Sequence, residues 1–244
     1  MKITIPLLFA FFSFHMAFSQ NEDREPPAVT FGKFTLHFTL GLPVQEFAEA
    51  MDGHATGLGF SFLMDIPETP VSVGVQLDYL SFSHKKLRVK SPIGNTGFEG
   101  DYDWTTRSQA LLPGAVFRLQ PEHGFLLKPY GEGSVGWRRL FTNTTLSDRN
   151  STGNSNSGTH LDISDWSLYY GGALGVTVAL APEVLLDLRC NLVIAPSADV
   201  YSKKKDAGIV EEPLDAFELK HPASTNLIMP EIGVSIMLSK EEEY

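Results

Sequence analysis

Cysteine and basic residues are both scarce in this sequence. Cys190 is the single cysteine, so no intrachain disulfide can form and stability has to come from strand pairing and packing. The chain has 19 Lys and Arg residues against 29 Asp and Glu residues, which gives a formal net charge of -10 at pH 7. Because nucleic-acid binding depends on Lys and Arg side chains that neutralise phosphates, this charge argues against a nucleic-acid partner.

Long apolar runs are also missing once the N-terminus is passed. No later segment approaches the roughly 20 consecutive apolar residues that a membrane helix needs. The N-terminus has Lys2, an apolar run over 3–14 and the small-residue site Ala17-Phe18-Ser19, which is the pattern of a secretory signal peptide. We therefore predict a signal peptide over 1–19, a short periplasmic segment over 20–30, a barrel domain over 31–240 and a charged tail over 241–244.

Catalytic and metal-binding motifs are a third absence. His54, His84, His160 and His221 fall in polar connections, and none has a spacing that requires a catalytic partner. No His-Glu-x-x-His pattern occurs. The sequence accordingly predicts a protein that is not an enzyme, with no catalytic residue, no cofactor and no metal site.

What the sequence does have is a two-residue alternation of apolar and polar side chains. Phe34, Leu36 and Phe38, for example, alternate with Thr35 and His37. Successive side chains of a strand point to opposite faces, so this period predicts strands rather than amphipathic helices. Eight segments show the pattern: 34–42, 58–66, 71–79, 104–120, 127–141, 166–180, 186–194 and 228–238.

The connections between these segments alternate between short and long. A barrel that crosses an outer membrane has this asymmetry, with small periplasmic turns on one rim and extended loops on the other. The short connections lie at 67–70, 120–125 and 181–183, and the long ones cover 44–55, 84–103, 142–164 and 196–225. The predicted fold is therefore all-β: a single eight-stranded antiparallel up-and-down transmembrane β-barrel, with short periplasmic turns and four long extracellular loops.

Two details of the long loops follow from local composition. The segment 47–51 is predicted to form one helical turn. The stretch 150–158 is too polar and too rich in glycine to bury a core, and we predict that it is mobile. An even number of strands places both termini on the periplasmic side.

The polar face of the strands carries Gly, Ala and Ser together with isolated charges of both signs. Such residues suit the narrow interior of an eight-stranded barrel, whereas a soluble lipocalin-type barrel points its apolar face inward. Because an unpaired buried charge costs several kcal/mol, we predict a polar network of salt bridges and hydrogen bonds that plugs the lumen; a polar solute path is the competing interpretation. Its predicted members are Asp65, Asp78, Arg118, Lys128, Glu132, Arg138, Asp187, Arg189 and Glu231, and His37 faces the same side.

Aromatic residues near the strand ends predict interfacial girdles, where an amphipathic ring lies between lipid and water. The alternative is that they are core aromatics of a soluble sandwich. The candidates toward the long loops are Tyr79, Trp104, Trp137, Phe141 and Trp166, with Phe34 and Phe125 toward the short turns.

Several short motifs carry a family resemblance. The signal ending at Ala17-Phe18-Ser19-Gln20, the stretch 111–113 and the run 128–136 resemble the small outer-membrane β-barrel proteins of Bacteroidetes-type bacteria. The segment 231–238 resembles the C-terminal assembly signal of such barrels, with aliphatic residues where aromatic ones are usual. This resemblance implies a bacterial outer-membrane location, contact with outer-membrane lipid, and barrel-insertion machinery as a partner during assembly.

The predicted function is that of a non-enzymatic outer-membrane protein, structural or partner-binding. A plugged barrel leaves the long loops as the accessible surface, so an envelope protein or a surface ligand would bind there. Three alternatives stay open at this stage: a channel for small solutes, an outer-membrane lipid-modifying hydrolase, and a soluble periplasmic lipocalin-like binder.

Overall fold

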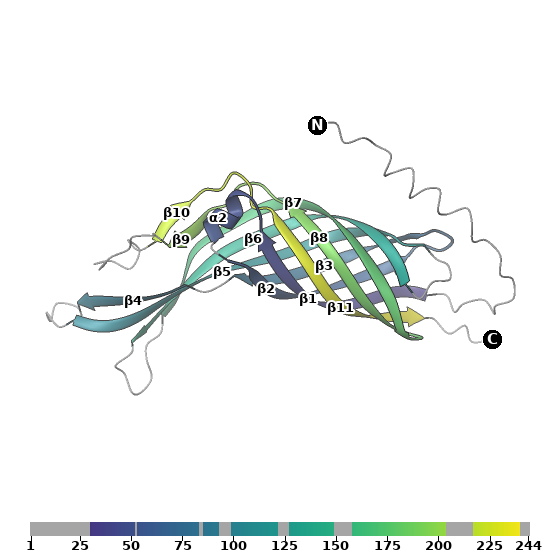
Figure 1. Ribbon diagram of the computed structural model, residues 1–244, viewed down its shortest axis with the longest axis horizontal. Helices are drawn as coiled ribbons and strands as arrows, with labels where there is room; N and C mark the ends of the chain where they lie inside the picture. Colours follow the sequence, from purple (N-terminus) through teal and green to yellow (C-terminus); the bar gives the residue numbers. More distant parts are fainter. Residues whose placement is uncertain are drawn as a thin grey trace.

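The computed structural model describes residues 30–51, 53–82, 85–92, 99–121, 127–148, 158–203 and 217–239. Its main body is a closed ring of eight antiparallel strands (Figure 1). They are β1 (Thr30–Pro43), β2 (Ala55–Asp65), β3 (Val71–Phe82), β5 (Glu99–Leu119), β6 (Leu127–Asp148), β7 (Gly158–Ala181), β8 (Val184–Ile194) and β11 (Leu227–Ser239). Neighbours in the chain pair throughout, and β1 pairs with β11 to close the ring. The predicted eight-stranded barrel is confirmed.

The two ends of the barrel differ as the connection lengths predict. Thr30 pairs with Ser239, so the first and last strands begin and end at the same rim, which also carries the tight turn closed by the Ile66 to Val71 hydrogen bond. We call this rim the short-turn end and the opposite rim the long-loop end. The long-loop end carries the helix and the small additional sheet.

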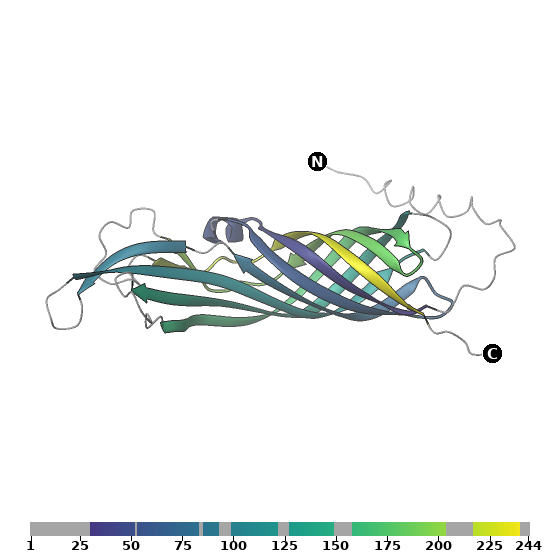
Figure 2. The same cartoon turned by 90° about the horizontal axis from the view of Figure 1, so that it is seen from below.

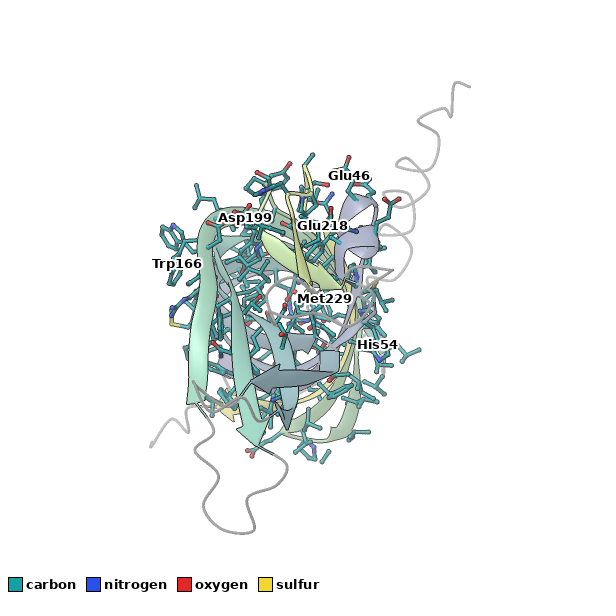
Figure 3. All side chains as sticks on the ribbon, turned by 90° about the vertical axis from the view of Figure 1, so that its left-hand side faces the viewer. Glu46, His54, Trp166, Asp199, Glu218 and Met229 are labelled. Carbon is teal, nitrogen blue, oxygen red and sulfur yellow. The ribbon has the colours of Figure 1, made fainter. Side chains whose placement is uncertain are left out.

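The first and last long connections contain regular structure of their own. Helix α2 (Glu46–Met51) confirms the predicted helical turn, and β9 (Val200–Lys203) pairs antiparallel with β10 (Phe217–Lys220). Figure 3 looks at the long-loop end and shows α2, β9 and β10 across the mouth of the barrel. No helix in the described ranges is long and apolar enough to cross a membrane.

The other two long connections correct the prediction. Strand β4 (Lys85–Pro92) pairs with the first part of β5, and β6 and β7 stay paired out to Leu146 and Gly158. Most of 84–103 and 142–164 is therefore strand rather than loop, and these hairpins project beyond the barrel (Figure 2). Pairing between strands satisfies the backbone N–H and C=O groups whether or not one face of the strands is buried. A hairpin in water therefore needs no alternation of apolar and polar residues, and the sequence pattern does not reveal it. The stretch predicted to be mobile lies, apart from Gly158, outside the described residues.

The barrel wall has an apolar outside and a largely polar inside. Leu36, Phe60, Leu174 and Ile232 point outward with exposed fractions of 58%, 39%, 76% and 51%. Alternating with Leu36, the inward Thr35 and His37 are buried. This is the reverse of a soluble lipocalin-type barrel, whose apolar face lines the interior. The predicted orientation of the two faces is confirmed, and the lipocalin-like alternative is wrong.

Glycine on the inner face makes room for large side chains from neighbouring strands. Gly59 of β2 lies between His37 of β1 and Asp78 of β3 in the strand register. A Cβ atom on Gly59 would lie 2.0 Å from Asp78 Oδ1 and 2.3 Å from His37 Nε2. The His37 and Asp78 side chains therefore meet above Gly59, where there is no room for a third side chain.

Substitution of Gly59 by alanine should destabilise the barrel. The new methyl group displaces the His37 and Asp78 side chains, and overpacking of this kind costs about 1–3 kcal/mol. Urea titration of the protein in lipid vesicles measures the free energy of unfolding. Gly133→Ala is the matched control, since a Cβ there meets nothing within 4 Å. Equal stabilities for the two variants would contradict the packing argument.

Candidate functional site

The middle of the lumen holds a group of buried charged side chains that we call the lumen ion cluster. Its members lie on the inner faces of β1, β3, β5, β6, β8 and β11. They are His37, Asp78, Arg118, Glu132, Asp187, Arg189 and Glu231, and each side chain is no more than 3% exposed. Alternation along the strands places them inside, and closure of the ring brings them together.

Arg118 organises one side of this cluster. Its Nε donates to Glu132 Oε1 at 2.5 Å, and its Nη1 donates to Asp187 Oδ2 at 3.3 Å. Its guanidinium carbon lies 3.8 Å from the centroid of the Tyr130 ring. The Tyr130 hydroxyl in turn donates to Asp187 Oδ1 at 2.5 Å. The cation is therefore held by two carboxylates and an aromatic face.

Arg189 organises the other side. Its Nε donates to Glu231, its cross-strand partner, and its Nη1 donates to Glu132 Oε2 at 3.1 Å. Glu132 thus bridges the two guanidinium groups, because its other oxygen binds Arg118. The planar five-donor fork of Arg suits such divided contacts better than a Lys ammonium would.

His37 joins the cluster from β1. Its Nε2 lies 2.6 Å from Asp78 Oδ1, 3.1 Å from Arg189 Nη2 and 3.5 Å from Glu231 Oε2. The imidazole therefore contacts a carboxylate and a guanidinium through the same nitrogen.

Three of the predicted network residues lie elsewhere. Asp65 is near the short-turn end, where it lies 3.5 Å from Lys33 Nζ and accepts from Ser72 Oγ at 2.5 Å. Lys128 is half-buried and forms no ion pair with a described residue. Arg138 lies toward the long-loop end, so the nine predicted residues do not form one continuous network.

Arg138 binds loop backbone instead of a carboxylate. Its Nη1 donates to the carbonyl oxygen of Thr225 at 2.9 Å, and its Nη2 donates to Ser167 Oγ at 2.9 Å. It therefore fastens the connection between β8 and β11 to the barrel wall.

An apolar layer separates the ion cluster from the mouth of the barrel, and sequence reasoning missed it. Leu80, Leu112 and Met229 are buried inside the ring, and Figure 3 shows Met229 within it. Each lies two residues along its strand from an inward-facing position, namely Asp78, Gly114 and Glu231, and so points to the same inner face. The whole layer is Phe47, Ala50, Met51, Ala55, Leu80, Phe82, Ala110, Leu112, Leu140, Tyr169, Val193, Ala195, Ala198, Val200, Leu227 and Met229.

The first and last loops close over this layer. Phe47 of α2 packs edge-on against Phe82, with ring centroids 5.7 Å apart. Glu46 accepts a hydrogen bond from the backbone N–H of Ala223 at 2.7 Å, and Asn226 donates to Gln45 at 3.1 Å. We call α2, β9, β10 and residues 195–199 and 221–226 the cover.

The predicted interfacial aromatics lie on the outer surface where their side chains are described. Tyr79, Leu111, Arg139 and Trp166 stand in one row across four strands, and Trp166 points away from the barrel in Figure 3. Trp137 and Phe141 lie one step of two residues to either side of Arg139 on β6. The Arg139 guanidinium carbon is 5.6 Å from the Trp166 ring centroid.

Two further candidates lie partly or wholly outside the described residues. Trp104 belongs to β5, but its side chain is not among those described, and Phe125 is not described. Phe34 is exposed on the outer wall near the short-turn end and stacks on Phe60, with centroids 6.2 Å apart.

Comparison with known proteins gives similarity to solved structures alone. No family model matches the chain, and no curated protein matches it. The chain is similar to a major outer membrane protein from Thermus thermophilus, with 14% identity over 85% of this chain and 99% of that chain, and a TM-score of 0.42.

Two other solved structures give similar values. OprG, an outer membrane protein from Pseudomonas aeruginosa, has 14% identity over 88% of this chain and 100% of that chain, with a TM-score of 0.40. Ail of Yersinia pestis, the attachment invasion locus protein, has 14% identity over 85% of this chain and 97% of that chain, with a TM-score of 0.40. These similarities assign no activity or partner to this chain. Its barrel fold rests on its own closed ring of strand pairs.

Removal of one guanidinium from the ion cluster should be strongly destabilising. Arg189→Met leaves Glu132 and Glu231 without one of their cations, and breaking a buried ion pair from one side costs about 3–5 kcal/mol. The free energy of unfolding in lipid vesicles is again the measurement. Lys33→Met is the control, because the Lys33 and Asp65 pair is more exposed and loses less. A loss at Arg189 no larger than at Lys33 would refute the role assigned to the cluster.

Proposed function

We propose that this chain is a non-enzymatic protein of the bacterial outer membrane. In this proposal its lumen is closed, and its role, structural or partner-binding, is carried by the surface at the long-loop end. The observation that carries the proposal is a closed barrel with an apolar outer wall. The signal peptide over 1–19, assembly by barrel-insertion machinery and the likeness to Bacteroidetes-type barrels remain predictions within it.

The apolar outer wall supports the membrane location. Soluble monomers rarely expose contiguous apolar patches beyond a few hundred Å². Here large apolar side chains face outward on all eight strands, and Val135, Leu168 and Leu180 are each more than half exposed. In hydrocarbon this surface is favourable, and a closed ring leaves no unpaired strand edge to lipid.

Two layers inside the barrel support a closed lumen. The ion cluster fills the middle of the lumen with paired charged side chains, and the apolar layer fills the part below the mouth. An eight-stranded barrel has room for little beyond its own side chains. Small-solute conduction would require both layers to move aside.

The cover and the projecting hairpins support a partner-binding role. The cover is tied to itself by hydrogen bonds between residues far apart in the chain, so it presents an ordered surface. Glu46, Glu49, Asp199 and Glu218 belong to it, and Figure 3 shows three of them at the outer edge of the mouth. These four carboxylates outnumber Lys203 and Lys220, the two Lys residues of the cover, so a partner with a basic surface fits it.

A charge placed on the outer wall should oppose membrane insertion. Leu174→Lys puts an ammonium on the most exposed of the large apolar side chains described on β7, and such a change costs about 2–4 kcal/mol near the bilayer midplane. The free energy of folding into lipid vesicles measures this cost. Leu219→Lys is the control, since Leu219 is exposed on β10 of the cover and would face water. An equally small cost at both positions would contradict the membrane location.

The wild-type protein should show no unitary conductance in a planar lipid bilayer, because the two layers block the lumen. A 16-stranded porin in the same bilayer is the positive control. Reproducible single-channel steps from the wild-type protein would overturn the closed lumen and favour the solute channel.

A further inference from the structure

We propose that the lumen ion cluster binds one divalent transition-metal ion, with His37, Asp78 and Glu231 as its ligands. The proposal goes beyond the proposed function and concerns a site that the spacing of residues in the sequence does not show. Zn²⁺ is the probe to which the argument commits. Charge, geometry and the free lone pairs of the cluster support it independently.

The charge of the cluster is unbalanced. When all of them are ionised, the four carboxylates of Asp78, Glu132, Asp187 and Glu231 carry two more charges than the two guanidinium groups of Arg118 and Arg189 that they face. Protonation of His37 would remove one of them. A divalent cation beside neutral His37 removes both. Since uncompensated buried charge is strongly destabilising, the cluster favours a bound dication.

The distances fit a metal ion. One ligand atom from each of the three side chains lies within 4.8 Å of the other two. Two ligands of a tetrahedral Zn²⁺, each about 2.1 Å from the metal, lie roughly 3.4 Å apart. His37 Nε2 and Glu231 Oε2 are 3.5 Å apart. Asp78 Oδ1, at 2.6 Å from His37 Nε2, has to draw back when the metal enters.

Free lone pairs are available on the two carboxylates. Asp78 Oδ2 and Glu231 Oε1 are fully buried and accept no hydrogen bond from the residues described. Glu231 can bind the metal through one lone pair of Oε2, the oxygen 3.5 Å from His37 Nε2, while the other lone pair keeps the bond from Arg189; Oε1 remains free for a second contact to the ion. Buried polar atoms are normally paired, and these two carboxylate oxygens lie beside one imidazole, so their lone pairs are available to a cation.

The contacts of His37 lead to the same conclusion. Its Nε2 lies near both Asp78 Oδ1 and Arg189 Nη2. One ring nitrogen cannot donate to a carboxylate and accept from a guanidinium at once, so either ring tautomer satisfies one contact and strains the other. A metal on Nε2 bridges His37 to Asp78, and Arg189 keeps its bonds to Glu132 and Glu231.

The strands hold the three ligands in place. His37 lies on β1, between Gly233 of β11 and Gly59 of β2 in the register. A Cβ atom on Gly233 would lie 2.7 Å from His37 Cβ, and one on Gly59 would meet both His37 and Asp78. The two glycines form a cradle for the imidazole. The nitrogen ligand favours Zn²⁺ and its neighbours in the first transition row over Mg²⁺ and Ca²⁺.

Metal analysis of the folded protein tests the proposal. Protein extracted from membranes in detergent is stripped with a chelator, dialysed against Zn²⁺ with an excess of Mg²⁺ and Ca²⁺, and its bound zinc is measured by mass spectrometry. We expect about one zinc ion per wild-type chain. His37→Gln and Glu231→Gln should each weaken binding by more than about 100-fold.

A matched control excludes binding at the loops. His221→Gln removes the exposed pair in which His221 Nδ1 lies 2.5 Å from Asp199 Oδ1, and it should leave the zinc content unchanged. Heat-dependent gel mobility shows whether each variant is folded. Where a variant does not fold, X-ray absorption at the zinc edge of the His221→Gln protein should still show imidazole nitrogen together with carboxylate oxygen.

The site would be overturned if the wild type retained no zinc, or if the zinc content were unaffected by His37→Gln and Glu231→Gln in folded protein. Zinc bound through oxygen alone in the absorption spectrum would also overturn it. None of these results bears on the membrane location or on the closed lumen, whose own tests measure insertion and conductance.

Discussion

The pairing of β1 with β11 is the contact on which the rest of the structure depends. It turns an open sheet into a ring, so every strand edge between the rims is paired and the wall can face hydrocarbon. It also sets His37 beside Gly233 and Thr39 beside Glu231. Without this pairing the first and last strands would be free edges, and the ion cluster would lose its contact between β1 and β11.

In so narrow a barrel, the charged side chains of the inner face have to be neutralised by one another. Eight strands leave space for side chains but little for bulk water, so each inward charge must find a partner across the lumen. Arg118 and Arg189 share Glu132, and glycine at Gly59 and Gly175 gives large neighbours room to reach inward. The small residues and the charged residues of the inner face therefore depend on each other, because the glycines provide the space in which the large charged side chains pair.

The sequence predicts well which side of the barrel wall a side chain faces, but it predicts poorly the position of that side chain along the barrel axis. Parity along a strand settles that Glu132, Lys128 and Arg138 all point inward, since they share the even positions of β6. It does not give the stagger between strands, which decides that Glu132 meets Arg118 while Arg138 meets the carbonyl of Thr225. For the same reason His37, Asp78 and Glu231 form no recognisable motif, although each was assignable to the lumen. The projecting hairpins were not predicted because backbone pairing does not require a buried face, and strands without one need no hydrophobic alternation in their sequence.

The order of the layers along the lumen couples the cover to the charges below it. Phe47 and the buried side chains around Met229 lie between the ion cluster and the water at the mouth. Excluding water from that side lowers the local dielectric, which strengthens each ion pair and also raises the cost of any charge left unpaired. A looser cover would admit water and weaken both effects. The apolar layer therefore increases the effect of the charge balance of the cluster on the stability of the barrel. The hydrogen bonds that hold the cover in place at the long-loop end, such as that between Glu46 and Ala223, stabilise the cluster indirectly because they keep this layer closed.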